Sequence, residues 1–240
     1  MTGVLYAALA ALGDVGGGLL VIWRTGRDRA LLAVLTGFGA GFMIALVVLG
    51  MLPHAVEIRG GFIAVLLGYL VVHLTQHSLT PHFHFGEETH AEEMVSRGIG
   101  VWALVGLLPH SFFDGVAISS GFLVNSQLGV LVFTGIILHK VPTGVSLGSI
   151  MLASGNSRTK SIAAVLAIAA ATIAGAFVTP FVGAMAEYGL PLAAGVTLYV
   201  AASNLIPESQ HAHGWGVHGG FIAGVLAYFL ILALLPSVPH

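Results

Sequence analysis

The sequence predicts an all-helical protein that crosses a membrane eight times. Only 8% of its 240 residues are charged, whereas a soluble domain has about a quarter. The mean hydropathy is +0.97, and 57% of the residues are hydrophobic. The apolar runs are continuous over about 20 residues and lack the alternation typical of barrel strands. A bundle of membrane-spanning helices is therefore the expected fold.

Eight apolar stretches are each close to the ~20 residues that a helix needs to cross a bilayer. In chain order they cover residues 3–23, 31–53, 61–79, 98–121, 127–152, 161–184, 189–207 and 217–236. The first stretch has no basic segment before it, so we expect a retained span and not a cleaved signal peptide. The whole of 1–240 is then expected to form a single transmembrane domain.

Basic residues gather in the loops on one side of the predicted bundle. The loops after spans 1, 3 and 5 contain Arg24, Arg27, Arg29, Arg97, Arg158 and Lys160. The opposite loops contain only Arg59. Cytoplasmic loops are enriched in Lys and Arg. We therefore expect a multi-pass plasma-membrane protein with both termini outside the cytoplasm.

The longest loop, residues 80–97, reads "TPHFHFGEETHAEEMVSR" and is cytoplasmic in this orientation. Its histidines and glutamates have two interpretations that the composition leaves open. The loop is either a solvated acidic connector or a low-affinity segment that collects metal ions.

Two spans have similar ends with opposite polarity. Span 2 ends in "MLPHAVE" (51–57) outside, and span 7 ends in "LIPESQH" (205–211) inside. This similarity indicates an inverted repeat that relates spans 1–3 to spans 6–8, with spans 4 and 5 between them.

Spans 4 and 5 contain the polar pairs that are most costly in a membrane. His110 and Asp114 lie four residues apart in "HSFFDG", and His139 and Thr143 repeat that spacing in "HKVPTG". Residues at i and i+4 share one helix face, and a short connection makes the two spans antiparallel neighbours. Two imidazoles, a carboxylate and a hydroxyl suit a borderline divalent ion such as Zn²⁺. The alternative for His110 and Asp114 is a buried hydrogen bond that joins two helices.

These paired motifs resemble those of the ZIP (Zrt-, Irt-like) metal transporters. That family has H-N-x-x-E/D-G in its fourth span and H/Q-E/D-x-P-E-G in its fifth. The eight spans, the His-rich loop, "GFGAGFM" in span 2 and "LIPES" in span 7 agree with it. The resemblance implies a 3+2+3 helix bundle that imports Zn²⁺, Fe²⁺ or Mn²⁺ as its transported substrate, without a cofactor.

The resemblance also implies which residues form the metal sites. The family's first metal position corresponds here to His110, Asp114, His139, Thr143 and Met43. Its second position corresponds to Ser111, Lys140, Asp114, Thr143 and Thr179, the last in "VTPFVG".

A binuclear centre needs bridging carboxylates, and in the second position only Asp114 retains one. Lys140 adds an ammonium group there. We therefore expect Lys140 to take the place of the second ion and to pair with Asp114. Asp114 would be the site's only carboxylate, shared between one metal ion and Lys140.

Polar residues near the span ends are weaker candidates for entrance or exit sites. They are His54, Glu57, His73, His77, Glu208, His211 and His213. The alternative for the pair in span 3 is two side chains that snorkel to the interface, and for the cluster at the end of span 7 it is a solvated helix end. Asp14, beside "GGG" in span 1, either lines the ion path or caps a broken span.

The leading functional hypothesis is a divalent metal transporter with alternating access, for which zinc is the favoured ion. Uptake should fall as the pH drops through the ordinary histidine pKa near 6.5, because imidazolium does not bind metal. The second hypothesis is a transport-inactive relative that acts as a metal sensor or interaction subunit, since Thr143 and Thr179 replace carboxylates. A membrane enzyme that uses His110 and Asp114 for acid–base chemistry ranks last, because no nucleophile, cofactor motif or HExxH string accompanies them.

The expected partners are a divalent ion and the lipid bilayer. The formal net charge is −2, and no basic patch indicates a nucleic acid. The sequence leaves the oligomeric state open, a homodimer included.

Overall fold

Helices are the only regular elements that the computed structural model contains within its described residues, which are 1–23, 29–78, 97–207 and 215–235. The predicted all-helical membrane fold is therefore confirmed. The predicted loop 80–97 lies outside the described residues, apart from its last residue.

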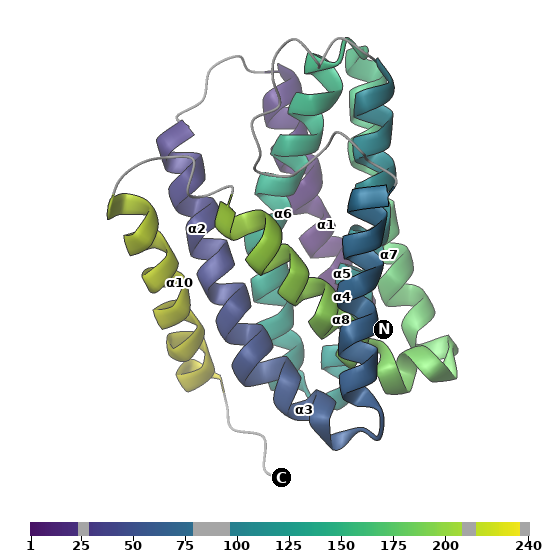
Figure 1. Cartoon of the computed structure of the whole chain (residues 1–240), viewed down its shortest axis with the longest axis vertical. Helices are drawn as coiled ribbons and strands as arrows, with labels where there is room; N and C mark the ends of the chain where they lie inside the picture. The colour runs from purple at the N-terminus through teal and green to yellow at the C-terminus, as the bar shows by residue number, and fades with distance from the viewer. Residues whose placement is uncertain (24–28, 79–96, 208–214, 236–240) are drawn as a thin grey trace.

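Within the described ranges, eight helical paths run along the bundle (Figure 1). They are α1 (Thr2–Trp23); α2 (Arg29–Ala45) with the π-helical segment η1 (Leu46–Met51) and α3 (Leu52–Glu57); α4 (Gly61–Ser78); α5 (Arg97–Val124); α6 (Ser126–Ala153); α7 (Arg158–Val178) with the 3₁₀ turn η2 (Thr179–Phe181); α8 (Gly183–Tyr199) with the π-helical segment η3 (Val200–Leu205); and α10 (Trp215–Leu234). α1 begins and α10 ends toward the lower end of the bundle in Figure 1.

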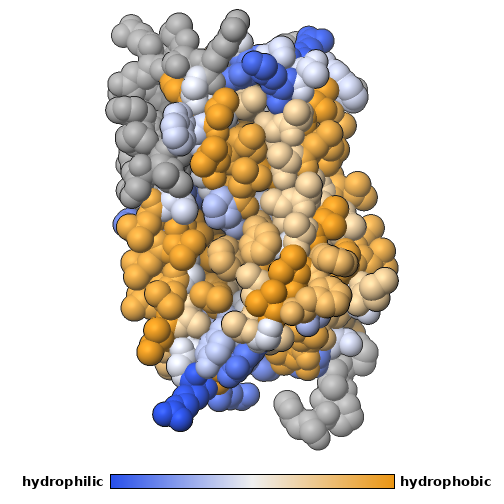
Figure 2. All heavy atoms as spheres, turned by 90° about the vertical axis from the view of Figure 1, so that its right-hand side faces the viewer, coloured by the Kyte–Doolittle hydropathy of each residue, from blue (hydrophilic) through white to orange (hydrophobic). Residues whose placement is uncertain are grey.

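The surface of the bundle is suited to lipid. Figure 2 shows a broad apolar band around the middle of one face, with hydrophilic side chains at its two ends. Of the eight paths, six are long and apolar enough to cross a membrane within the described residues. The apolar stretch Gly61–Gln76, which is part of α4, is shorter than the six. The path of α8 is the other one that is not among the six, and α4 packs against α8. The chain is thus a multi-pass membrane protein.

The packing of the helices follows an inverted repeat. α1 packs against α6 as α7 packs against α5, and α2 packs against α10 as α8 packs against α4. Spans 1–3 are α1, α2 and α4, spans 4 and 5 are α5 and α6, and spans 6–8 are α7, α8 and α10. Exchanging spans 1–3 with spans 6–8, and span 4 with span 5, converts each packed pair into its counterpart.

Glycines let the paired backbones approach closely at equivalent places. A β-carbon on Gly144 of α6 would overlap the Asp14 carbonyl of α1, and one on Gly115 of α5 would overlap the Thr172 carbonyl of α7. The two contacts are counterparts in the repeat. They fix α1 against α6, and α7 against α5, at the height of Asp14 and Thr172.

The two π-helical segments are also counterparts. η1 precedes Pro53 by two residues, and η3 precedes Pro207 by two residues. Because proline has no N–H, it leaves a carbonyl one turn earlier without its α-helical donor. A local change to π geometry accommodates that loss, and such segments are frequent at functional sites.

Candidate metal site

Three potential metal ligands converge between α5 and α6. They are His110 and Asp114 from one face of α5 and His139 from α6. One ligand atom from each lies within 4.8 Å of the others, and the residues are only 2%, 1% and 1% exposed. A single residue, Asn125, separates the two helices, and its side chain accepts the Leu128 N–H at 2.8 Å to cap α6.

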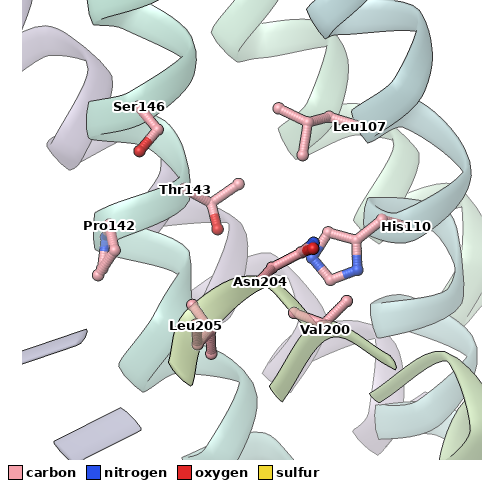
Figure 3. A pocket seen from close by; sticks show the side chains of 8 residues that line it. All are labelled: Leu107, His110, Pro142, Thr143, Ser146, Val200, Asn204 and Leu205. Atoms are coloured by element: carbon pink, nitrogen blue, oxygen red, sulfur yellow. The ribbon is translucent and has the colours of Figure 1, made fainter. Parts of the chain in front are cut away.

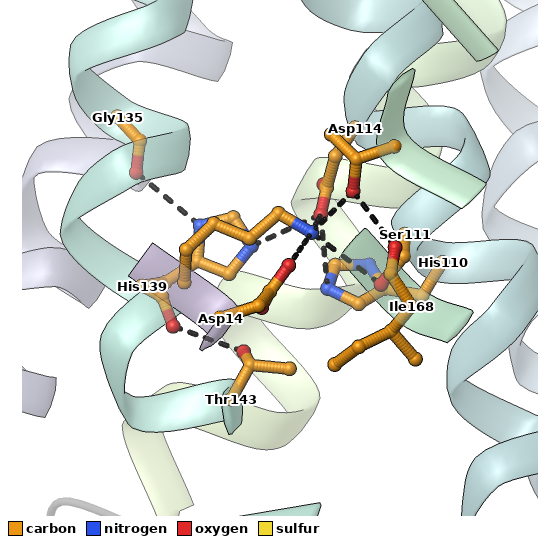
Figure 4. Close-up of polar contacts among 10 residues, drawn as sticks. Asp14, His110, Ser111, Asp114, Gly135, His139, Thr143 and Ile168 are labelled. Carbon is orange, nitrogen blue, oxygen red and sulfur yellow. Dashed lines mark hydrogen bonds and ion pairs between the residues drawn. The ribbon is translucent and has the colours of Figure 1, made fainter. Parts of the chain in front are cut away.

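The spacing of the ligand atoms suits a tetrahedral ion. Asp114 Oδ2 lies 3.5 Å from His110 Nε2 and 3.4 Å from His139 Nε2. A tetrahedral zinc with ligands at 2.0–2.1 Å has ligand atoms about 3.3 Å apart. The two separations from Asp114 Oδ2 therefore need little change to admit an ion of this size (Figure 4).

The imidazoles are free to ligate at Nε2. His139 Nδ1 lies 3.3 Å from the Gly135 carbonyl oxygen, so this nitrogen is the protonated one and Nε2 keeps its lone pair. Neither ring nitrogen of His110 has a hydrogen-bond partner among the described residues. Buried polar atoms without partners are uncommon and call for an explanation, such as an ion that is not part of the structure.

Lys140 is held in the same cluster by oxygen atoms from three helices. Its Nζ lies 3.0 Å from Asp114 Oδ2, so the predicted ion pair is confirmed. It also lies 2.9 Å from Asp14 Oδ2, 2.8 Å from Thr172 Oγ1 and 3.4 Å from Ser111 Oγ. Asp114 is the only carboxylate in the ligand group within the described residues, but the prediction did not include Asp14 of α1, which is a second carboxylate partner of Lys140 (Figure 4).

The residue that α7 contributes also differs from the prediction. Thr179 donates to the Gly175 carbonyl at 2.7 Å at the end of the helix, and the α7 hydroxyl that contacts Lys140 belongs to Thr172. The predicted residue, Thr179 in "VTPFVG", lies two helical turns beyond Thr172, at a different level along the bundle axis. The sequence feature that could have identified Thr172 is its position three residues before Gly175. Asp14 likewise lies three residues before Gly17.

The other two predicted ligands have different surroundings. Thr143 Oγ1 donates to the His139 carbonyl at 2.9 Å, which leaves its lone pairs available. Met43 is fully buried in an apolar cluster with Val72 and Tyr199. Their part in ion binding stays a prediction.

A pocket opens beside His110. It is lined by Leu107, His110, Pro142, Thr143, Ser146, Val200, Asn204 and Leu205 (Figure 3). From His110 and Thr143 it extends by one turn toward the start of α5 and the end of α6. The sequence reasoning missed Ser146 and Asn204. Two sequence features could have identified them. Ser146 lies three residues after Thr143, and Asn204 is an amide in an apolar span immediately before "LIPES".

Apolar side chains fill the bundle on the other side of the cluster. A buried core there includes Phe42, Leu46, Ile118, Val132 and Ile136. Ile118 lies one turn beyond Asp114, and Ile136 lies one turn before His139. The cluster therefore borders a pocket on one side and a closed apolar core on the other.

The candidate entrance and exit residues are only partly described. His54 Nδ1 donates to the Gly50 carbonyl at 2.8 Å at the end of η1, and Glu57 is exposed. His73 packs against the rings of Tyr69 and Tyr199.

The remaining candidates lie beyond what the structure describes. The side chain of His77 and residues 208–214, which include Glu208, His211 and His213, are outside the described residues.

Comparisons with known proteins point to one family. The family model for the ZIP zinc transporter matches residues 71–235. The zinc transporter zipt-7.2 of Caenorhabditis elegans is 28% identical over 41% of this chain and 23% of its own length. The human zinc transporter SLC39A7 is 31% identical over 47% of this chain and 26% of its own length. The zinc transporter ZIP9 of Micropogonias undulatus is 27% identical over 73% of this chain and 62% of its own length. The matched regions thus cover less than two thirds of these relatives.

Proposed function

This chain belongs to the ZIP zinc transporter family, and on that premise we propose that it carries a divalent metal cation, zinc foremost, across the plasma membrane into the cytoplasm. The described helices act as a single transport domain. A transporter of this kind carries the ion as substrate and needs no enzymatic step.

One observation carries the proposal. His110, Asp114 and His139 present three ligand atoms within 4.8 Å of one another in the interior of a helix bundle. Ionisable residues at such positions are costly and mark ion pathways by default. Two imidazole nitrogens and one carboxylate oxygen, with an open fourth position, favour zinc among the ions of this family.

The pocket supports an inward path. Its far end, at Leu107 and Ser146, faces the loops that contain the predicted cytoplasmic basic residues, among them Arg158 and Lys160. With both termini outside, this arrangement is the inward-facing state of an alternating-access cycle. The ion leaves past Thr143 and Asn204 after the apolar core has closed behind it.

The site holds one ion. Lys140 occupies the place where a second ion would need carboxylate bridges, and its Nζ already lies 3.0 Å from Asp114 Oδ2. An ammonium at this distance leaves no room for a second divalent charge.

The test is metal-resolved uptake in proteoliposomes that contain the purified protein. We expect zinc uptake by the wild type and a fall to the empty-liposome level for His110→Ala and for His139→Ala. His218→Ala is the matched control, because His218 is exposed on α10. Uptake by His110→Ala at the wild-type rate would reject this site.

A transport-inactive metal sensor or interaction subunit is the second candidate. It is favoured by Thr143, which supplies a hydroxyl where the family has a carboxylate and which donates its proton to the His139 carbonyl. Retained zinc binding by the wild type, without any uptake, would select this candidate over transport.

A further inference from the structure

Asp14 is a buried carboxylate that the one-ion site does not use as a ligand. It lies on α1, is fully buried, and places Oδ2 2.9 Å from Lys140 Nζ. Its position is fixed by the close packing of α1 against α6. A β-carbon on Gly144 would overlap the Asp14 carbonyl, and one on Gly13 would come within 2.9 Å of Lys140 Cβ. The α1 and α6 backbones therefore meet where Asp14 faces Lys140.

The Lys140 ammonium group keeps enough hydrogen-bond acceptors when Asp114 binds a metal ion instead. An ammonium group has three protons to donate. Without Asp114, its Nζ still has Asp14 Oδ2 at 2.9 Å, Thr172 Oγ1 at 2.8 Å and Ser111 Oγ at 3.4 Å. The three acceptors come from α1, α7 and α5.

Asp114 Oδ2 is the atom for which the ammonium and the ion compete. It lies 3.0 Å from Lys140 Nζ and 3.4–3.5 Å from the two imidazole Nε2 atoms. Two carboxylates and one ammonium give the cluster a formal charge of −1 when both imidazoles are neutral. A divalent ion then brings it to +1. Without the Asp14 charge, the same ion would bring a neutral cluster to +2.

We infer that Asp14 is a positioning residue for metal binding: it holds the Lys140 ammonium and so releases Asp114 to the ion. Thr172 and Ser111 complete the ammonium's contacts. The Asp14–Lys140 pair also limits the site to one ion, because it neutralises the carboxylate that a second ion would need. This inference rests on the proposed function, since it assumes that the ion binds Asp114.

Three near-isosteric variants of the full chain test it through zinc affinity and stoichiometry, measured by calorimetry and equilibrium dialysis in detergent. Asp14→Asn leaves Lys140 with Asp114 as its only carboxylate, so we expect the zinc affinity to fall by about 10- to 100-fold. Adding Lys140→Met to Asp14→Asn restores the charge of −1, so we expect the double variant to regain most of the affinity. Lys140→Met alone leaves two unpaired carboxylates, so we expect two bound ions per chain where the wild type binds one.

The double variant separates a charge effect from misfolding, because a misfolded Asp14→Asn protein would not be rescued by a second core substitution. Unchanged affinity in Asp14→Asn, no rescue in the double variant, or a single ion in Lys140→Met would each overturn the inference and leave the proposed function standing. A wild-type protein that binds no zinc would overturn both.

Discussion

Replacing Lys140 with methionine should destabilise the metal-free protein strongly. Methionine has a similar length but no charge, so the change leaves the Asp14 and Asp114 carboxylates buried and unpaired. Both Oδ2 atoms lie within 3.0 Å of the lost Nζ, so they are no more than about 6 Å apart, and their repulsion is at least about 3 kcal/mol at an effective dielectric constant near 20. Removing one partner of a buried ion pair typically costs about 3–5 kcal/mol.

The assay is unfolding of the purified protein in detergent with a chelator present. We expect Lys140→Met to lose about 3–5 kcal/mol of stability. The double variant Asp14→Asn/Lys140→Met should lose less, because Asp14→Asn removes the repulsion between the two carboxylates. Lys160→Met is the matched control: Lys160 is exposed, so its effect should stay within about 0.5 kcal/mol. Wild-type stability for Lys140→Met in chelator would refute the buried ion cluster.

Further predictions concern helix packing, pH and the pocket. Gly144→Ala should destabilise the protein by about 1–3 kcal/mol in the same unfolding assay, because the added methyl group meets the α1 backbone. Gly16→Ala, which has open space around it, should not, and equal loss in both would exclude the close contact. Zinc uptake should fall in acid, because protons compete with the ion for its imidazole ligands; uptake that stays at its neutral-pH level down to about pH 4 in liposomes would count against imidazole ligation. Thr143→Asp should raise zinc affinity about tenfold by adding a carboxylate on the pocket side, and unchanged calorimetric affinity would place Thr143 outside the site.

The helical paths follow from the sequence because lipid imposes a simple rule. A run of about 20 apolar residues must be a helix there, since every backbone group needs an internal partner. The structure accordingly has a helical path along each predicted apolar stretch. The π-helical segments could not be predicted in the same way. They depend on how Pro53 and Pro207 are accommodated against neighbouring helices, which the apolar pattern does not record.

The site was predictable where it is local in sequence. His110 and Asp114 share a helix face by their spacing, and the short connection brings His139 beside them. The contact between Asp14 and Lys140 joins helices far apart in the chain and depends on the close approach at Gly144. The sequence showed only a carboxylate beside glycines, which was compatible with a helix cap as well as with a residue that lines the ion path.

Anomalous diffraction at the zinc absorption edge, from crystals of the zinc-loaded protein, tests the one-ion site most directly. The geometry predicts a single strong peak between α5 and α6, about 2 Å from His110 Nε2, Asp114 Oδ2 and His139 Nε2, with Lys140 still paired with Asp14. Two peaks between these helices, or a single peak that none of the three ligands touches, would contradict it.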